Sequence, residues 1–177
     1  AMAVDRRHRR VIRENLQGAF PQWSDARVQA VTLSAFQYWG RMVAELIHVR
    51  QLSDERAAAR VSNFFAAADD LAAEGRGVLI VTAHLANFEL LGRICGAAGR
   101  RMVAFYRPMN NRFVHDFFSR QRASMNMGEI GRGIAVREAL RELKAGSWLA
   151  LPLDQNQPPG RGIFVDFLGR PASTSTL

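Results

Sequence analysis

The stretch VLIVTAHLANFELL, residues 78–91, contains the change of pattern that decides the fold. It opens with a run of aliphatic and β-branched residues after Gly77, which predicts a short strand buried on both faces. Asn87 is a preferred helix N-cap residue, and the residues after it predict a helix from about 88 to 98. The segment therefore predicts a strand, a turn and a helix, with His84 in the turn and Glu89 in the first helical turn.

The same alternation of strand and helix continues toward the end of the chain. We expect strands at residues 102–106, 147–151 and 162–167, helices at 112–125 and 134–145, and a loop over 128–133. Strands that alternate with helices of about a dozen residues are typical of βαβ units, whose strands are parallel. The pattern predicts an α/β fold with a mainly parallel sheet flanked by helices.

The residues before this segment predict helices only. Apolar residues recur at helical spacing up to Pro21 and again after Ser24, and Ser53 is a candidate N-cap for a third helix. We therefore expect one domain over residues 1–177, made of a helical region, 1–75, followed by an α/β region that begins at residue 76.

The composition indicates a folded protein with an anionic partner. Apolar residues make up 48%, and 24 basic against 16 acidic residues give a net charge of +8, with Lys144 the sole lysine. Arginine suits bidentate contact with phosphate and carboxylate, so nucleic acid, a phospholipid surface or an acidic protein could be the partner. A codon bias toward arginine is the alternative explanation. Cys95 is the single cysteine, so neither a disulfide within the chain nor a cysteine-based zinc site is expected.

No sequence run approaches the roughly 18 apolar residues that a membrane-spanning helix needs. The basic cluster RRHRR, residues 6–10, is either a membrane-surface anchor or a solvated helix face. The first residues and the stretch 172–177 resemble neither a natural start nor a natural end, so we expect the chain to be truncated.

Four polar residues are expected at or near strand ends, where ligands gather in open α/β sheets. They are His84, Arg107, Asp154 and, within the last strand, Asp166. A glutamate that bonds one nitrogen of His84 would fix the imidazole tautomer and leave the other nitrogen free as a general base. On spacing alone, the alternative is that Glu89 only caps the helix beside an unrelated histidine.

Other motifs are weaker. Residues 128–133, GEIGRG, either present backbone N–H groups to an anion or form a flexible turn. GxSxG, HxxxH and CxxC patterns are absent, so neither a serine hydrolase nor a metal site is expected. The remaining histidines are expected to be exposed helical residues: His8, His48 and His115.

Several motifs occur in a fixed order along the chain. They are HLANFE at 84–89, YRPMNN at 106–111, RQR at 120–122, PLDQN at 152–156, and the stretch from Phe164 through Asp166, Gly169, Arg170 and Pro171 to Thr176. This series resembles that of the bacterial lipid A biosynthesis acyltransferases, the lauroyl/myristoyl acyltransferases of the lysophospholipid acyltransferase superfamily. The resemblance covers roughly residues 75–177 and implies a glycerol-3-phosphate acyltransferase-like fold.

The resemblance also implies an activity. Such an enzyme moves an acyl chain from acyl carrier protein, or acyl-CoA, to a hydroxyl of a membrane glycolipid such as a lipid A precursor, without a covalent intermediate. It needs no cofactor besides the acyl donor. It works at the cytoplasmic face of the bacterial inner membrane, peripherally or through an N-terminal helix that we expect to be missing from this sequence. The implied partners are acyl carrier protein, an anionic lipid acceptor and the membrane surface, and no nucleic acid.

The resemblance assigns roles to individual residues. His84 would be the general base and Glu89 the carboxylate that orients it. The complete set of expected catalytic residues is His84, Glu89, Arg122 and Asp154. The expected substrate-binding residues are Asn87, Arg107, Arg120 and Arg170.

Other functions stay open at this point. The acceptor could be another phosphoglycolipid or a lysophospholipid. The chain could instead be a non-enzymatic, basic, membrane-peripheral binding module in which His84 and Glu89 are structural, or a hydrolase of thioesters or lysolipids.

Overall fold

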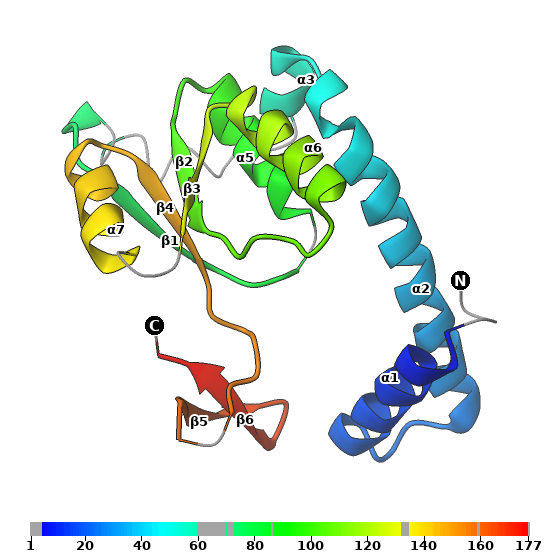
Figure 1. Cartoon of the computed structure of the whole chain (residues 1–177). Coiled ribbons are helices and arrows are strands. Elements are labelled where there is room, and N and C mark those ends of the chain that lie inside the picture. Colours follow the sequence, from blue (N-terminus) through cyan, green and yellow to red (C-terminus); the bar gives the residue numbers. More distant parts are fainter. Residues whose placement is uncertain are drawn as a thin grey trace. The chain divides into compact units, whose positions relative to one another are not determined.

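The computed structural model describes residues 5–59, 70, 73–85, 87–131, 135–158 and 160–176 (Figure 1). The chain groups into two compact units. One combines residues 1–45 with 156–176, and the other comprises residues 46–155. The expectation of one domain over the whole chain stays a prediction.

The second unit is built on a four-stranded parallel sheet. Its strands are β1 (Val78–Thr82), β2 (Met102–Phe105), β3 (Met127–Ile130) and β4 (Trp148–Pro152). They lie in the order β1-β4-β2-β3, and every neighbouring pair is parallel. The connecting helices are α5 (Phe88–Ala97), α6 (Arg112–Ala123) and α7 (Ala135–Lys144). The predicted α/β fold is confirmed.

Helices cover both faces of this sheet. On one face, Cys95 of α5 packs in a buried cluster with Met102 and Trp148. On the other face, Ala139 of α7 packs in a second cluster with Leu149. Successive strand residues point to opposite faces, so β4 contributes to both clusters and its residues 148–151 are all buried. Each large apolar side chain buried in this way stabilises the fold by about 1.5–3 kcal/mol.

The prediction that the first strand is buried on both faces is wrong. Val78 and Ile80 pack against the core, but Leu79 is 51% exposed and Val81 is 65% exposed. The reason is that these two side chains lie on the face where α7 packs, and the main contacts of α7 are with β3 and β4. The expectation fits β4 instead, which lies between two strands.

The predicted loop over residues 128–133 is also wrong in its first half, which lies in β3 and pairs with β2. Met127 and Ile130 are buried at the two ends of this strand. A Cβ on Gly128 would lie 2.5 Å from Val103 Cγ1, so glycine permits the close approach of the two strands. Residues 132–134 lie outside the described residues.

Short helical elements precede the sheet in the second unit. They are the 3-10 helix η1 (Val49–Gln51) and α3 (Asp54–Ala58). Ser53 Oγ accepts a hydrogen bond from Arg56 N at 3.4 Å, which confirms the predicted N-cap. Arg93 of α5 donates to the Leu52 carbonyl through Nε at 3.1 Å and thereby ties the two regions together. The apolar positions expected to continue this helix, namely Val61, Phe64, Phe65 and Leu71, lie outside the described residues.

The first unit contains α1 (Arg6–Ala19), most of α2 (Asp25–His48) and a hairpin of β5 (Gly162–Phe167) and β6 (Arg170–Ser175). The strand expected at residues 162–167 therefore exists, but it forms a separate antiparallel sheet and not the fourth strand of the parallel one. Leu168 and Gly169 have φ of 56° and 73°. Positive φ at both central residues suits the tight turn of a two-residue hairpin.

Candidate active site

Three of the predicted site residues follow neighbouring strands at one edge of the parallel sheet. His84 follows β1, Asp154 follows β4 and Arg107 follows β2. Ligand sites in open parallel sheets form at this edge, beyond the carboxyl ends of the strands. Asp166 does not belong to this group, because it lies in the hairpin, where its Oδ1 accepts a hydrogen bond from Gly169 N at 3.1 Å. Its expected place at the sheet edge is wrong.

His84 is held by both oxygens of Asp154. Nδ1 of the ring lies 2.8 Å from Oδ1, and the backbone N–H of His84 donates to Oδ2, also at 2.8 Å. A proton on Nδ1 that is donated to this carboxylate leaves Nε2 as the basic nitrogen. Gln155 Nε2, an amide donor, lies 3.3 Å from that nitrogen, in keeping with Nε2 as an acceptor.

This pair is accessible to solvent. The side chains of His84 and Asp154 are 38% and 39% exposed. Partial burial opposes ionisation of Asp154, but hydrogen bonds from the ring and backbone of His84 outweigh it, and the pKa of Asp154 lies below its usual value. Asp154 is therefore a carboxylate at neutral pH and a suitable partner for an imidazolium.

Glu89 lies in a different environment. Asn87 caps α5, as predicted, by accepting a hydrogen bond from Leu90 N at 3.2 Å through Oδ1. Glu89, in the first turn of this helix, is completely buried, and its Oε1 accepts hydrogen bonds from Nε of Arg122, at 2.7 Å, and from Nη2. The structure thus pairs Glu89 with Arg122 of α6, and the expected hydrogen-bonded pair of Glu89 with His84 is replaced by His84–Asp154.

The sheet explains this exchange of partners. β1 and β4 pair in parallel with Thr82 opposite Pro152. His84 and Asp154 each come two residues later, so they leave the sheet at the same level and side by side. Glu89 is already inside a helix at that point, and its side chain reaches the buried guanidinium instead.

Arg122 is the centre of a buried network. Its Nη1 donates to Glu129 Oε1 of β3 at 2.8 Å, and its guanidinium lies 4.5 Å from the ring centre of Tyr106. Burial alone would lower the pKa of Arg122, but the hydrogen bonds and charges of Glu89 and Glu129 raise it above its usual value. Arg122 is therefore permanently charged, and its side chain, only 8% exposed, links α6 to α5 and β3.

Sequence reasoning missed the other members of this network. Tyr106 Oη lies 3.2 Å from Nδ1 of His115, and the two rings stack 5.6 Å apart. The expectation that His115 is an exposed helical residue is wrong, because it is half-buried against Tyr106. Ser119 Oγ donates to Glu129 at 3.2 Å. The tyrosine stands in one of the motifs, but its partners could not be read from spacing.

The remaining predicted residues are dispersed. Arg107 is exposed at the sheet edge, and Arg120 is exposed on α6. Arg170 belongs to the other unit, where a Cβ on Gly18 would lie 2.0 Å from its Nη1. Asn87 Nδ2 and Glu89 Oε2 are buried and have no hydrogen-bond partner among the described residues. The substrate-binding roles of these residues stay predictions.

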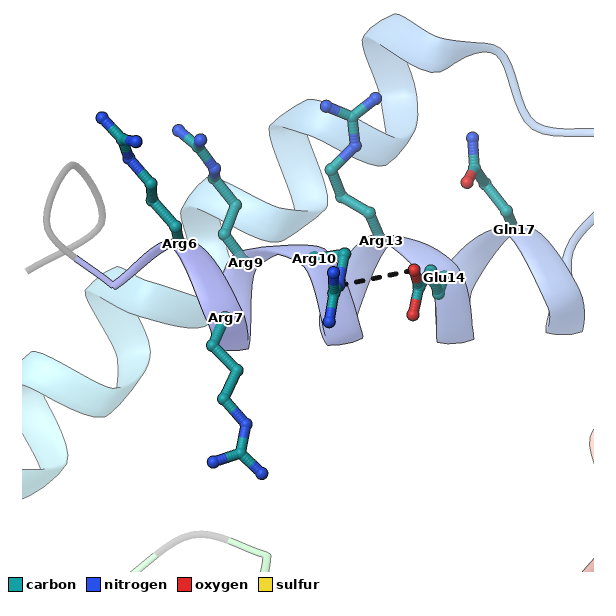
Figure 2. A pocket seen from close by; sticks show the side chains of 7 residues that line it. All are labelled: Arg6, Arg7, Arg9, Arg10, Arg13, Glu14 and Gln17. Carbon is teal, nitrogen blue, oxygen red and sulfur yellow. Dashed lines mark ion pairs between the residues drawn. The ribbon is translucent and has the colours of Figure 1, made fainter.

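The basic cluster near the N-terminus forms the exposed face of α1. Arg6, Arg9 and Arg13 project to one side of this helix, and Arg7 projects to the other (Figure 2). His8 lies beside Asp5, with its Nδ1 2.7 Å from Oδ2. None of the described helices is long and apolar enough to cross a membrane. Within the described residues, no three metal-type ligands come together. The membrane-surface interpretation of the cluster stays a prediction.

Cys95 has no place in this chemistry. It is completely buried in α5, and burial raises the pKa of its thiol to about 12. The thiol is thus an inert part of the core.

Comparison with known proteins agrees with the motif order. The family model for bacterial lipid A biosynthesis acyltransferases matches residues 1–177. The lipid A biosynthesis palmitoleoyltransferase of Escherichia coli strain K12 is 30% identical over 167 residues, which is 92% of this chain and 53% of that protein. The lipid A biosynthesis acyltransferase of Shigella flexneri matches to the same extent. The chain spans about half the length of these relatives, and it belongs to the bacterial lipid A biosynthesis acyltransferase family.

Proposed function

We propose that the protein transfers a fatty acyl chain from a thioester donor to a hydroxyl of a membrane glycolipid, with His84 as the general base. The observation that carries this proposal is the double hydrogen bond of Asp154 to His84, at 2.8 Å each, at the carboxyl edge of a parallel sheet. The arrangement fixes the ring and directs a basic Nε2 toward an exposed surface.

The proposed step is direct acyl transfer. Nε2 of His84 takes the proton of the acceptor hydroxyl as that oxygen attacks the thioester carbonyl. The C–S bond then breaks, and the thiolate leaves and receives the proton back from the imidazolium. Asp154 stabilises the imidazolium in between, because its carboxylate is already ionised and bonded to Nδ1. No covalent enzyme intermediate forms.

Arg107 is the candidate residue for binding or stabilising the negative charges of this reaction. It follows β2 at the same sheet edge, is exposed, and makes no ion pair with any described residue. A free guanidinium there suits an acceptor phosphate or the developing oxyanion. Arg122 is less suited, because Glu89 and Glu129 already occupy its donors. We assign Glu89 and Arg122 a positioning role: they hold the start of α5, and so the turn that carries His84.

The finer identity of the substrates is also part of the proposal. Membership of the lipid A family and the names of the two relatives support a lipid A precursor as acceptor. We propose acyl carrier protein as the carrier of the donor, with acyl-CoA as the alternative, and the cytoplasmic face of the inner membrane as the place of reaction.

The decisive experiment incubates the purified protein with a radiolabelled acyl thioester of carrier protein and, separately, of coenzyme A. Each reaction is run in detergent with and without a lipid A precursor. We expect label and a mass gain of one acyl chain in the lipid. Label in neither lipid nor free acid would instead support a binding module. Release of free fatty acid without the acceptor would support a hydrolase.

A further inference from the structure

A groove lies between the end of α2 with η1 on one side and α6 on the other. It encloses about 550 Å³. Gln121 of α6 is buried and donates a hydrogen bond to the Leu46 carbonyl at 2.9 Å, which joins the two walls. Both walls belong to the second unit, and none of the residues that line the groove comes from the His84 edge of the sheet.

Three apolar side chains line this groove and are exposed. Phe113 is 86% exposed, Phe117 is 47% exposed and Ile47 is 50% exposed. Phe113 and Phe117 stand one helical turn apart, so they share a face of α6. Apolar side chains that gather on a surface in this way mark a binding site more often than isolated ones do.

The charge of the groove is positive. Arg50 and Arg120 line it, and neither makes an ion pair with any described residue. The one acidic side chain of the lining, Asp116, lies 3.7 Å from Nε of Arg112. Free guanidinium groups beside an apolar floor match an amphiphile that joins an anionic headgroup to hydrocarbon.

The arginine face of α1 provides a contrast within the same chain. The hollow along α1 is lined by arginines, Glu14 and Gln17, without a single apolar side chain (Figure 2). Such a surface attracts anions but offers nothing to an acyl chain. The groove at α6 combines both features, and this combination identifies the kind of ligand.

We propose that the groove binds an anionic phospholipid of the membrane surface. Its phosphate contacts Arg50 and Arg120, and its glycerol and upper acyl chain lie against Ile47, Phe113 and Phe117. The site docks the protein on the bilayer. The inference concerns binding and holds whether or not the protein transfers acyl chains.

Vesicle co-sedimentation tests this inference without any activity assay. Two kinds of vesicle are compared. One contains phosphatidylcholine with roughly 3 parts in 10 of phosphatidylglycerol, which makes its surface anionic, and the other contains phosphatidylcholine alone. We expect the protein to bind the anionic vesicles. Arg50→Gln/Arg120→Gln should lower the partition coefficient roughly 30-fold, since each cation near such a surface contributes roughly fivefold. Phe113→Ser should lower it roughly tenfold.

The matched control is Arg137→Gln/Lys144→Gln on α7. These two side chains are exposed, and the double variant removes the same charge. It should bind nearly as the unmodified protein does. Equal losses in both double variants would show general charge attraction and overturn the proposal, as would unchanged binding in the groove variants. Release of the protein from vesicles by glycerol phosphate alone would identify a free-phosphate site and overturn it too.

Circular dichroism and the melting temperature verify that each variant folds. Phe113→Ser, at so exposed a position, should melt at the same temperature as the unmodified protein.

Discussion

His84 and Glu89 stand five residues apart in one motif, but the structure places them in opposite environments. The His84 side chain is 38% exposed and bonds to Asp154 at the sheet edge. Glu89 is completely buried and bonds to Arg122 between two helices. In the proposed mechanism, one short motif therefore supplies both the general base and a structural anchor, which lie on either side of one turn.

The difference in burial decides what each pair contributes. An exposed ion pair such as His84–Asp154 contributes about 0–1 kcal/mol to stability. Removing one partner of a buried pair such as Glu89–Arg122 costs about 3–5 kcal/mol, because the other charge is left without compensation. Variants at the sheet edge should therefore affect activity, and variants in the buried network should affect stability.

The largest effect is expected for His84→Ala. Loss of the general base should lower kcat/KM for acyl transfer roughly 10²–10⁴-fold. The free energy of unfolding should change by less than about 0.5 kcal/mol, since the side chain is partly exposed. Acyl-transfer kinetics and urea unfolding measure the two quantities. Leu85→Ala is the control, because Leu85 follows His84 directly in the sequence and is 79% exposed. It should leave both kcat/KM and the free energy of unfolding unchanged. Near-normal transfer by His84→Ala would contradict the proposed mechanism.

Arg122→Ala should show the reverse pattern. It leaves Glu89 buried without its cation and should lower the free energy of unfolding by about 3–5 kcal/mol, measured by urea denaturation. Arg120→Ala is the matched control from the same motif, because Arg120 is exposed and should change stability by less than about 0.5 kcal/mol. Equal stability of the two variants would mean that Arg122 acts as a substrate ligand and not as a structural link.

Tyr106 allows the contributions inside the network to be separated. Tyr106→Phe removes the hydrogen bond to His115 but keeps the ring beside Arg122, and it should cost about 1 kcal/mol of stability. Tyr106→Leu also removes the cation–π contact and should cost about 0.5–2 kcal/mol more. Thermal unfolding of the two variants gives the difference, and identical melting temperatures would exclude a contribution from the ring.

The smallest effect on stability is expected for Asp154→Asn, and it depends on pH. The pKa of Asp154 is lower in the folded protein than in the unfolded chain, so its carboxylate stabilises the fold above the unfolded pKa, about 3.9. That contribution is lost as the pH falls through the folded pKa.

At neutral pH the variant should thus be less stable by no more than about 1 kcal/mol, and the difference should vanish once the pH has fallen below the folded pKa of Asp154. Urea unfolding of both proteins across this pH range is the measurement. A difference that grows as the pH falls would mean that the shift has the opposite sign.

Much of the local structure could be predicted from the sequence. The β-branched run before residue 83 and the polar residues Asn87 and Ser53 determine where a strand ends and where helices begin, because these preferences act within a few residues. A loop was predicted over residues 128–133, and the strand at Met127–Ile130 was missed because its glycine and glutamate are typical of a loop. It forms because Met127 and Ile130 become buried beside β2.

The order of motifs along the chain was enough to indicate the family, the strand–helix alternation and the sheet edge at which His84 and Asp154 lie. It could not indicate which carboxylate meets His84. Asp154 is 70 residues away and becomes the partner only because β1 and β4 are neighbours in the sheet. Strand order and the buried partners of Arg122 result from packing of the whole unit, since long-range burial, and no local preference, sets which side chains meet.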